Sequence, residues 1–210
     1  MSAPMTDTQR GQPYPFLSEV AEMRRRARRL IANGAVTVNY AADRDVVLRL
    51  LNEALATEVV CILRYRRHYF MASGTLAEAI KDEFLQHSQE EQAYADQLAE
   101  RIVQLGGAPN FNPQGMLERS HSEYEEGESL ADMIEEDLIA ERIAIESYRE
   151  IIQYIGDKDS TTRRLFESIL AVEEEHAEEL ASMRADILRG DRGSNSGNGT
   201  PIHPESCNNP

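Results

Sequence analysis

The sequence contains no tryptophan, only two cysteines, and no proline inside its four longest stretches of helical apolar pattern. Cys61 and Cys207 are too few and too differently placed to suggest a disulfide framework, so a reducing compartment is the simpler expectation. No apolar run has the length of a signal peptide or a membrane span. We therefore expect a cytoplasmic protein with no membrane partner.

Positive charge is also scarce, since 22 Lys and Arg residues stand against 37 Asp and Glu residues, a formal net charge of −15. This balance disfavours nucleic acid as a partner for the body of the protein and favours attraction of cations. The 210 residues are enough for one domain with a sizeable core. A composition of 41% hydrophobic and 28% charged residues suits a helical protein.

Composition divides the chain into three parts. Residues 1–42 are an N-terminal extension, with a flexible leader over 1–15 followed by a short basic helix over 16–33 that Gly34 stops. Residues 43–189 are the expected folded domain. Residues 190–210 are dense in Gly, Ser, Asn and Pro and are predicted to be disordered.

Four long helices are predicted within the folded domain. Asp43 is the expected N-cap of the first, and Thr75 with Glu78 fits a capping box at the start of the second. The first and last connections are short, whereas the middle one exceeds twenty residues and contains two prolines. This connectivity is typical of a four-helix bundle with one long crossover. The expected helices span residues 44–73, 75–105, 129–155 and 160–189.

Each predicted helix has an apolar stripe in steps of three and four residues that polar side chains interrupt near its middle. In such a bundle the four midpoints meet at one level. Burying bare carboxylates costs several kcal/mol each unless something neutralises them. The pattern therefore predicts a pair of metal ions. The interrupting residues are Glu58, Glu91, Glu141, Glu173 and His176.

The ligand types indicate which metal is expected. Glu173 and His176 are three residues apart, so both project from one helix face. Carboxylates with an imidazole are a ligand set for iron or manganese. Oxygen-rich ligands stabilise Fe(III), which favours oxidation of Fe(II) by O₂ or H₂O₂.

Four passages carry a resemblance to a known family: LNEALATEVV, EEQAYADQLAERIVQLGGAPNF, EEDLIAERIAIESY and ILAVEEEHAEEL. Over residues 51–182 the chain resembles the bacterioferritin and Dps-like branch of the ferritin-like superfamily. The resemblance implies an all-α, ferritin-like four-helix bundle with one long crossover, here with an extra N-terminal helix. It also implies a ferroxidase that stores or detoxifies iron in a homo-oligomeric shell, with two Fe ions per subunit, Mn being possible.

The resemblance assigns roles to individual residues. Glu58 and Glu141 correspond to terminal ligands, Glu91 and Glu173 to bridging ligands, and His176 to a nitrogen donor. Tyr65 matches a family tyrosine beside the centre that could relay an electron. No fifth helix of 24-subunit cages is evident after Arg189, which favours twelve subunits.

Two departures from the family pattern stand out. Tyr94 lies where the second Glu-x-x-His motif requires histidine, so it is either a core tyrosine bonded to a carboxylate or a metal ligand, and one metal position is weakened. His87 is expected to be half-buried and bonded to a neighbour, and it lies roughly 10 Å along the helix from position 94. Gln92 replaces the methionine of haem-binding bacterioferritins, so no haem is expected.

Alternative interpretations stay open. The buried carboxylates could form a hydrogen-bonded network with arginines such as Arg142. The protein could also be a di-metal enzyme that consumes peroxide without storing metal, or a scaffold whose site Tyr94 has degraded. The simpler expectation for Tyr148 is packing with one hydrogen bond, and Cys61 is expected to be an inert small hydrophobe.

Three further groups of polar residues are not expected to carry function. The basic run Arg24–Arg29 is expected to be a solvated or intersubunit face and not a DNA-binding tail. His121 with Glu123, Glu125 and Glu126 is expected to solvate the crossover loop, the alternative being an ion entry route in a shell. His203 and Cys207 have no metal-site spacing.

Overall fold

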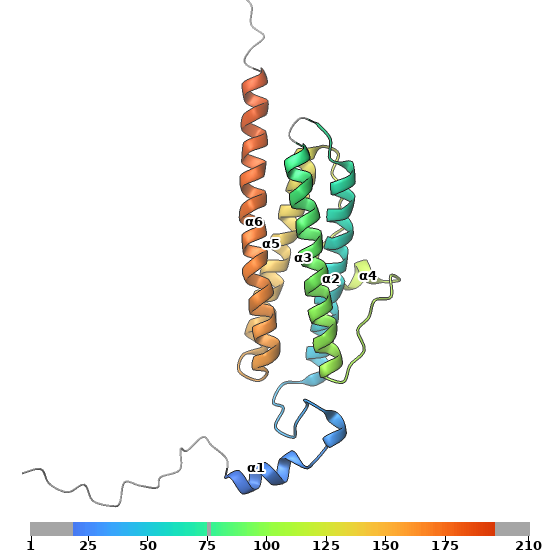
Figure 1. Ribbon diagram of the computed structural model, residues 1–210, viewed down its shortest axis with the longest axis vertical. Coiled ribbons are helices and arrows are strands. Elements are labelled where there is room, and N and C mark those ends of the chain that lie inside the picture. The colour runs from blue at the N-terminus through green and yellow to red at the C-terminus, as the bar shows by residue number, and fades with distance from the viewer. Residues whose placement is uncertain (1–18, 75–76, 196–210) are drawn as a thin grey trace, which may run out of the picture.

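The computed structural model describes residues 19–74 and 77–195, the last six of them by their backbone alone. Four long helices lie side by side in this part of the chain (Figure 1). No strand occurs among the described residues, which confirms the prediction of an all-α bundle. The helices are α2 (Arg44–Met71), α3 (Ala77–Gln104), α5 (Leu130–Ile155) and α6 (Ser160–Asn195).

The helices pack as two hairpins, α2 against α3 and α5 against α6. Contacts between the hairpins fix their direction, because Tyr65 of α2 contacts Glu141 of α5 while Glu58 contacts Tyr148. Residue numbers rise along α2 as they fall along α5, so these two helices are antiparallel. This arrangement needs the long connection between α3 and α5 that the sequence predicted.

Side-chain caps explain where two of the helices begin. The Asp43 carboxylate accepts hydrogen bonds from the backbone N–H groups of Asp45 and Val46, as predicted for the start of α2. Ser129 and Asp132 form a capping box at the start of α5. The capping box predicted at Thr75 lies outside the described residues.

The crossover between α3 and α5 contains the short helix α4 (Met116–Arg119) and then runs along the bundle (Figure 1). Side chains of α2 hold its backbone. Arg64 Nη1 donates to the Glu123 carbonyl at 2.8 Å, and His68 Nε2 lies 3.1 Å from the Glu126 carbonyl. The backbone carbonyls of this acidic stretch are therefore structural anchors.

The N-terminal extension differs from the prediction of one helix over 16–33. It has two short elements, α1 (Val20–Ala27) and the 3₁₀ helix η2 (Ile31–Asn33), with Leu30 in the left-handed region at φ 54° between them. A non-glycine residue in that region cannot continue a right-handed helix. Helix α1 lies beyond the end of the bundle (Figure 1). Arg24 and Arg25 are exposed on this helix, and Arg28 and Arg29 are exposed just after it.

The C-terminal helix is longer than predicted, since α6 continues from Arg189 to Asn195. It extends past the other three long helices (Figure 1). The predicted leader over 1–15 and the tail residues His203 and Cys207 lie outside the described residues.

Two apolar clusters fill the bundle on either side of its middle. One contains Leu51, Leu55, Leu98, Ile102 and Phe166, and the other contains Phe84, Ile134 and Leu180. The interrupting polar residues lie between these clusters, at the level that the sequence pattern predicted. Across the described helices, none is both long enough and apolar enough to cross a membrane.

Candidate metal centre

All five predicted ligand residues are buried at the middle of the bundle. Glu58, Glu91, Glu141 and Glu173 are each 1% exposed, and His176 is 2% exposed. They come from α2, α3, α5 and α6, so each long helix contributes at least one. The structure therefore brings together the residues that the sequence singled out.

The ligand atoms of four of the five residues converge on one point, and Glu58 is not in this group. One atom each from Glu91, Glu141, Glu173 and His176 lie within 4.8 Å of one another. His176 Nδ1 is 3.7 Å from Glu91 Oε1 and 3.7 Å from Glu173 Oε2. The other ring nitrogen, Nε2, is 2.8 Å from Glu90 Oε2. A carboxylate at Nε2 favours the proton there, which leaves the Nδ1 lone pair facing the centre.

Two tyrosines orient the carboxylates of Glu58 and Glu141. The Tyr65 hydroxyl donates to Glu141 Oε1, and the Tyr148 hydroxyl donates to Glu58 Oε1. Both tyrosines are fully buried. Each donor occupies one oxygen of its carboxylate and turns the other toward the middle of the bundle. The packing-plus-hydrogen-bond interpretation of Tyr148 is confirmed by this contact.

Several buried atoms of the centre have no hydrogen-bond partner among the described residues. They include Glu58 Oε2, both Glu91 oxygens, Glu173 Oε2 and His176 Nδ1. Buried polar atoms almost always have a partner, because an unsatisfied group costs about 1–3 kcal/mol. These are all lone-pair donors, and together they fit divalent cations.

Raised pKa values of the buried carboxyl groups also favour a cation-binding site. Burial raises the pKa of Glu91 to about 8. Burial, followed by the charges of neighbouring carboxylates, raises the pKa of Glu58 and of Glu173 well above the usual value. Without metal the cluster must therefore retain protons, and a divalent cation can replace them.

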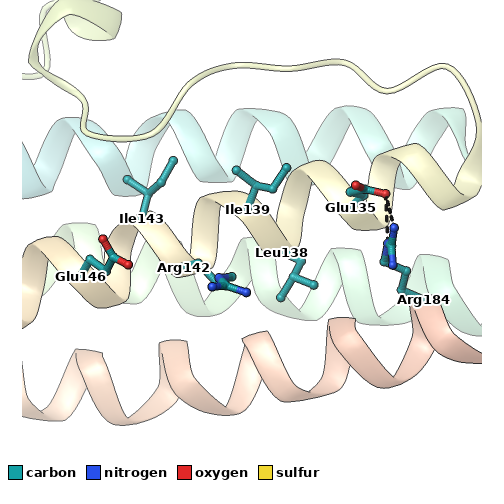
Figure 2. Close-up of a pocket in the computed structure, with 7 residues that line it drawn as sticks. All are labelled: Glu135, Leu138, Ile139, Arg142, Ile143, Glu146 and Arg184. Atoms are coloured by element: carbon teal, nitrogen blue, oxygen red, sulfur yellow. Dashed lines mark hydrogen bonds and ion pairs between the residues drawn. The ribbon is translucent and has the colours of Figure 1, made fainter.

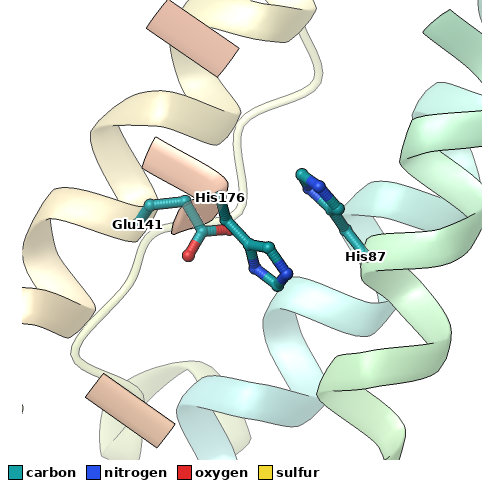
Figure 3. A group of neighbouring side chains, drawn as sticks. All are labelled: His87, Glu141 and His176. Atoms are coloured by element: carbon teal, nitrogen blue, oxygen red, sulfur yellow. The ribbon is translucent and has the colours of Figure 1, made fainter. Parts of the chain in front are cut away.

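His87 lies closer to the centre than the sequence suggested. It is fully buried rather than half-buried, and its ring stacks on His176 with centroids 3.9 Å apart and an interplanar angle of 19° (Figure 3). Spacing along α3 could not reveal this contact, because packing against α6 creates it. His87 does bond to neighbours, as expected, through Tyr65 and Glu179.

Tyr94 is half-buried and packs against the apolar cluster around Leu98. Burial and the charges of Glu90 and Glu173 raise its pKa, so the neutral phenol is favoured. The hydrogen bond to a carboxylate that the sequence suggested is absent among the described residues. Tyr94 is thus near the centre and not bonded into it.

The network with arginines does not involve Arg142. That side chain is exposed on the outer surface of α5, in a groove that also contains Ile139 and Glu146 (Figure 2). Arg64, by contrast, is a buried arginine that the sequence did not predict. Arg64 is 1% exposed and donates to Asp137 Oδ1 at 2.8 Å, while His68 Nδ1 lies 2.8 Å from Asp137 Oδ2.

The Arg64–Asp137 ion pair lies outside the candidate metal centre. Arg64 uses its donors on Asp137, the Glu123 carbonyl and Cys61, and donates to none of the four central carboxylates. Cys61 is buried and free, and burial raises the pKa of its thiol, which matches the expectation of an inert residue. Arg64 is three residues from Cys61 on α2. Because arginine is usually exposed, nothing in the sequence predicted that its guanidinium group would be buried.

Comparisons with known proteins give a consistent result. The family description "Ferritin-like domain" matches residues 48–189. A bacterioferritin from Mycobacterium avium is 33% identical over 135 residues, which cover 64% of this chain and 80% of that protein.

Two solved structures extend the likeness. One is described as a dodecameric thioferritin, the bacterioferritin-related protein from Bacteroides fragilis. It is similar to this chain with a TM-score of 0.70 and 29% identity, and the match covers 73% of this chain and 92% of that chain. Another, from Bacillus anthracis, is described as ferritin-like, diiron-carboxylate proteins. It has a TM-score of 0.61 and 27% identity over 68% of this chain and 98% of that chain.

Proposed function

The chain belongs to the ferritin-like domain family, in its bacterioferritin and Dps-like branch, and from this premise we propose that it oxidises Fe(II) at a dinuclear centre in its bundle. Iron storage or detoxification is the general function that the family supports. The proposed oxidant is O₂ or H₂O₂. Two Fe(II) ions supply two electrons, which reduce O₂ to H₂O₂ or H₂O₂ to water.

The observation that carries this proposal is the set of unpartnered lone pairs in the dry middle of the bundle. Five such atoms belong to Glu58, Glu91, Glu173 and His176, and among the described residues only a protonated neighbouring carboxyl could donate to these carboxylates. A metal pair bound there would supply redox chemistry. Glu58 and Glu141 would be terminal ligands, Glu91 and Glu173 bridging ligands, and His176 the nitrogen donor.

Surrounding residues prepare these ligands for binding. Glu90 holds the His176 proton on Nε2, so that Nδ1 is available. Tyr65 and Tyr148 each occupy one carboxylate oxygen, which directs the other inward. Tyr65 is also the residue we propose as a one-electron donor, by its position beside Glu141.

Tyr94 makes the centre asymmetric. One metal position has the His176 imidazole, whereas the other has a half-buried phenol in place of a second imidazole. A phenol with a raised pKa is a poor ligand. We therefore propose that this second position binds iron more weakly.

Gln92 supports the proposal that no haem is bound. Its side chain is exposed on α3 and donates to Asp96 at 3.1 Å. An amide cannot act as an axial thioether ligand. We also propose a homo-oligomeric shell of twelve subunits, on the support of the dodecameric relative from Bacteroides fragilis.

Ligand removal tests the function directly. A Glu91→Gln/Glu173→Gln variant should lose rapid Fe(II) oxidation, followed as Fe(III) absorbance after mixing anaerobic protein and Fe(II) with O₂ or H₂O₂. The matched control is Glu175→Gln, an exposed neighbour on α6. Equal oxidation rates in the variant and the control would refute the dinuclear centre.

The same preparation separates the alternatives. A mineral core that grows with added Fe(II) supports storage. Peroxide turnover without a core would instead indicate a di-metal enzyme that consumes peroxide. Fewer than one metal ion per chain, with no Fe(II) oxidation, would indicate a scaffold.

A further inference from the structure

A second group of metal-ligand atoms lies between the centre and solvent. Glu83, His87 and Glu179 each offer one ligand atom, and the three atoms lie within 4.8 Å of one another. Glu83 and His87 are four residues apart on α3, and Glu179 faces them from α6. None of these residues belongs to the proposed ligand set of the dinuclear centre.

Burial changes steadily across this group. The Glu179 side chain is 51% exposed, Glu83 is half-buried, and His87 is fully buried. The His87 ring stacks on His176, whose imidazole belongs to the centre (Figure 3). The group therefore forms a continuous path of ligands from the surface of the bundle to its middle.

Hydrogen bonding fixes how His87 is presented. Its Nδ1 is 3.2 Å from the Tyr65 hydroxyl, and its Nε2 is 3.1 Å from Glu179 Oε2. His87 is therefore held between a hydroxyl at Nδ1 and a carboxylate at Nε2.

In the tautomer that carries its proton on Nδ1, the Nε2 lone pair of His87 faces the Glu179 carboxylate. A divalent cation held between this nitrogen, Glu179 and the nearby Glu83 carboxylate would be a partner for all three ligand atoms.

The spacing suits a shared ion. When two ligand atoms each lie about 2.1 Å from an ion and the ligand–ion–ligand angle is about 90°, the two atoms are about 3 Å apart. The separation of His87 Nε2 and Glu179 Oε2 is 3.1 Å. One nitrogen and two carboxylate oxygens form a set that binds Fe(II), Co(II) or Zn(II), with positions left for water.

We propose that Glu83, His87 and Glu179 form a third divalent-cation site, from which Fe(II) passes to the dinuclear centre. The site itself is argued from the geometry of these three residues, whereas its role in passage rests on the proposed function. Three protein ligands and partial exposure suit an ion that binds reversibly. No bond of the protein is made or broken in this passage.

Cobalt binding tests the site without relying on activity. Anaerobic Co(II) titration of the full-length oligomer, with anomalous diffraction at the cobalt edge, should give three ions per chain in the wild type. A Glu83→Gln/Glu179→Gln variant should bind two. The matched control, Asp82→Asn/Glu178→Gln, removes the same charge from exposed neighbours and should still bind three.

Each result has a distinct meaning. Two cobalt ions in the centre of both wild type and variant would overturn the third site and leave the proposed function standing. Three ions in the variant would place the third elsewhere and also overturn it. Cobalt only at His87 would keep the site and remove the function, and cobalt at neither position would refute both.

Discussion

At the residue scale, the chemistry of the centre depends on which side chain stands three residues after Glu91. In this chain it is Tyr94, half-buried and without a hydrogen bond to another described residue. A neutral phenol offers a weak ligand where an imidazole would offer a strong one. In the proposed dinuclear centre, the consequence would concern the second metal position and leave the first intact.

We expect Tyr94→His to raise the initial rate of Fe(II) oxidation, by about tenfold if the imidazole contributes about 1.4 kcal/mol to the transition state. Stopped-flow absorbance of Fe(III) formation measures the rate. Tyr94→Phe is the control, since it removes the hydroxyl without adding a ligand. A lower rate in both variants would assign the phenol a role of its own.

Tyr148 gives a second prediction at this scale. Tyr148→Phe removes the hydrogen bond to Glu58 Oε1, which leaves this buried acceptor without a donor. The Glu58 carboxylate is then no longer held with its other oxygen facing the centre. Metal affinity of the centre should fall by about tenfold, measured by anaerobic Co(II) titration at fixed pH. Tyr154→Phe, at an exposed position on the same helix, should leave affinity unchanged.

At the scale of helices, a buried ion pair joins the two hairpins. Arg64 of α2 and Asp137 of α5 are both almost fully buried, and His68 shares the same carboxylate. Arg64 and His68 also hold the crossover backbone at residues 123 and 126. Loss of Asp137 would therefore disturb α2, α5 and the crossover together.

Asp137→Asn should destabilise the fold by about 3–5 kcal/mol, because it leaves the Arg64 charge buried without its counter-ion. Chemical denaturation of metal-free protein at fixed concentration measures the change. Glu136→Gln, the neighbouring and less buried carboxylate, is the control and should cost less than about 1 kcal/mol. Similar midpoints for the two variants would contradict this account of Asp137.

The helices show what periodicity can and cannot reveal. Apolar residues in steps of three and four predicted all four long helices, and the interruptions predicted where Glu58, Glu91, Glu141 and Glu173 would meet. Arg64 and Asp137 were missed because each looks like an ordinary surface charge in sequence. Their burial depends on each other across two helices.

The same limit explains His87. Its distance from position 94 along α3 was estimated from the helical rise, which says nothing about a neighbouring helix. The stack on His176 and the contact with Glu179 both come from α6. Residues that face one another between helices, rather than along one helix, are those that the sequence left undetermined.

At the scale of the whole molecule, the buried carboxylates make stability depend on pH. Burial raises the pKa of Glu91 to about 8 and that of Glu58 and Glu173 well above the usual value. In the unfolded chain these groups ionise at ordinary carboxyl pKa values. Between the two ranges the folded protein binds more protons, so its stability falls as pH rises.

We therefore expect the melting temperature of metal-stripped protein to fall between about pH 5 and about pH 8. Co(II) should restore it, and the gain should be larger at the higher pH because metal binds the ionised carboxylates that protons leave. Scanning calorimetry with chelator or with Co(II) measures both effects.

The net charge of −15 also destabilises the fold as pH rises, because the negative charges repel one another. A comparison variant is therefore needed to separate this surface effect from the effect of the buried carboxylates. Glu91→Gln/Glu173→Gln keeps the overall surface charge and removes two buried ionisable groups. Its metal-free melting temperature should depend less on pH, and Co(II) should raise it less than in the wild type. If wild type and variant fall in parallel, the pH dependence comes from the surface and the centre does not bind these protons.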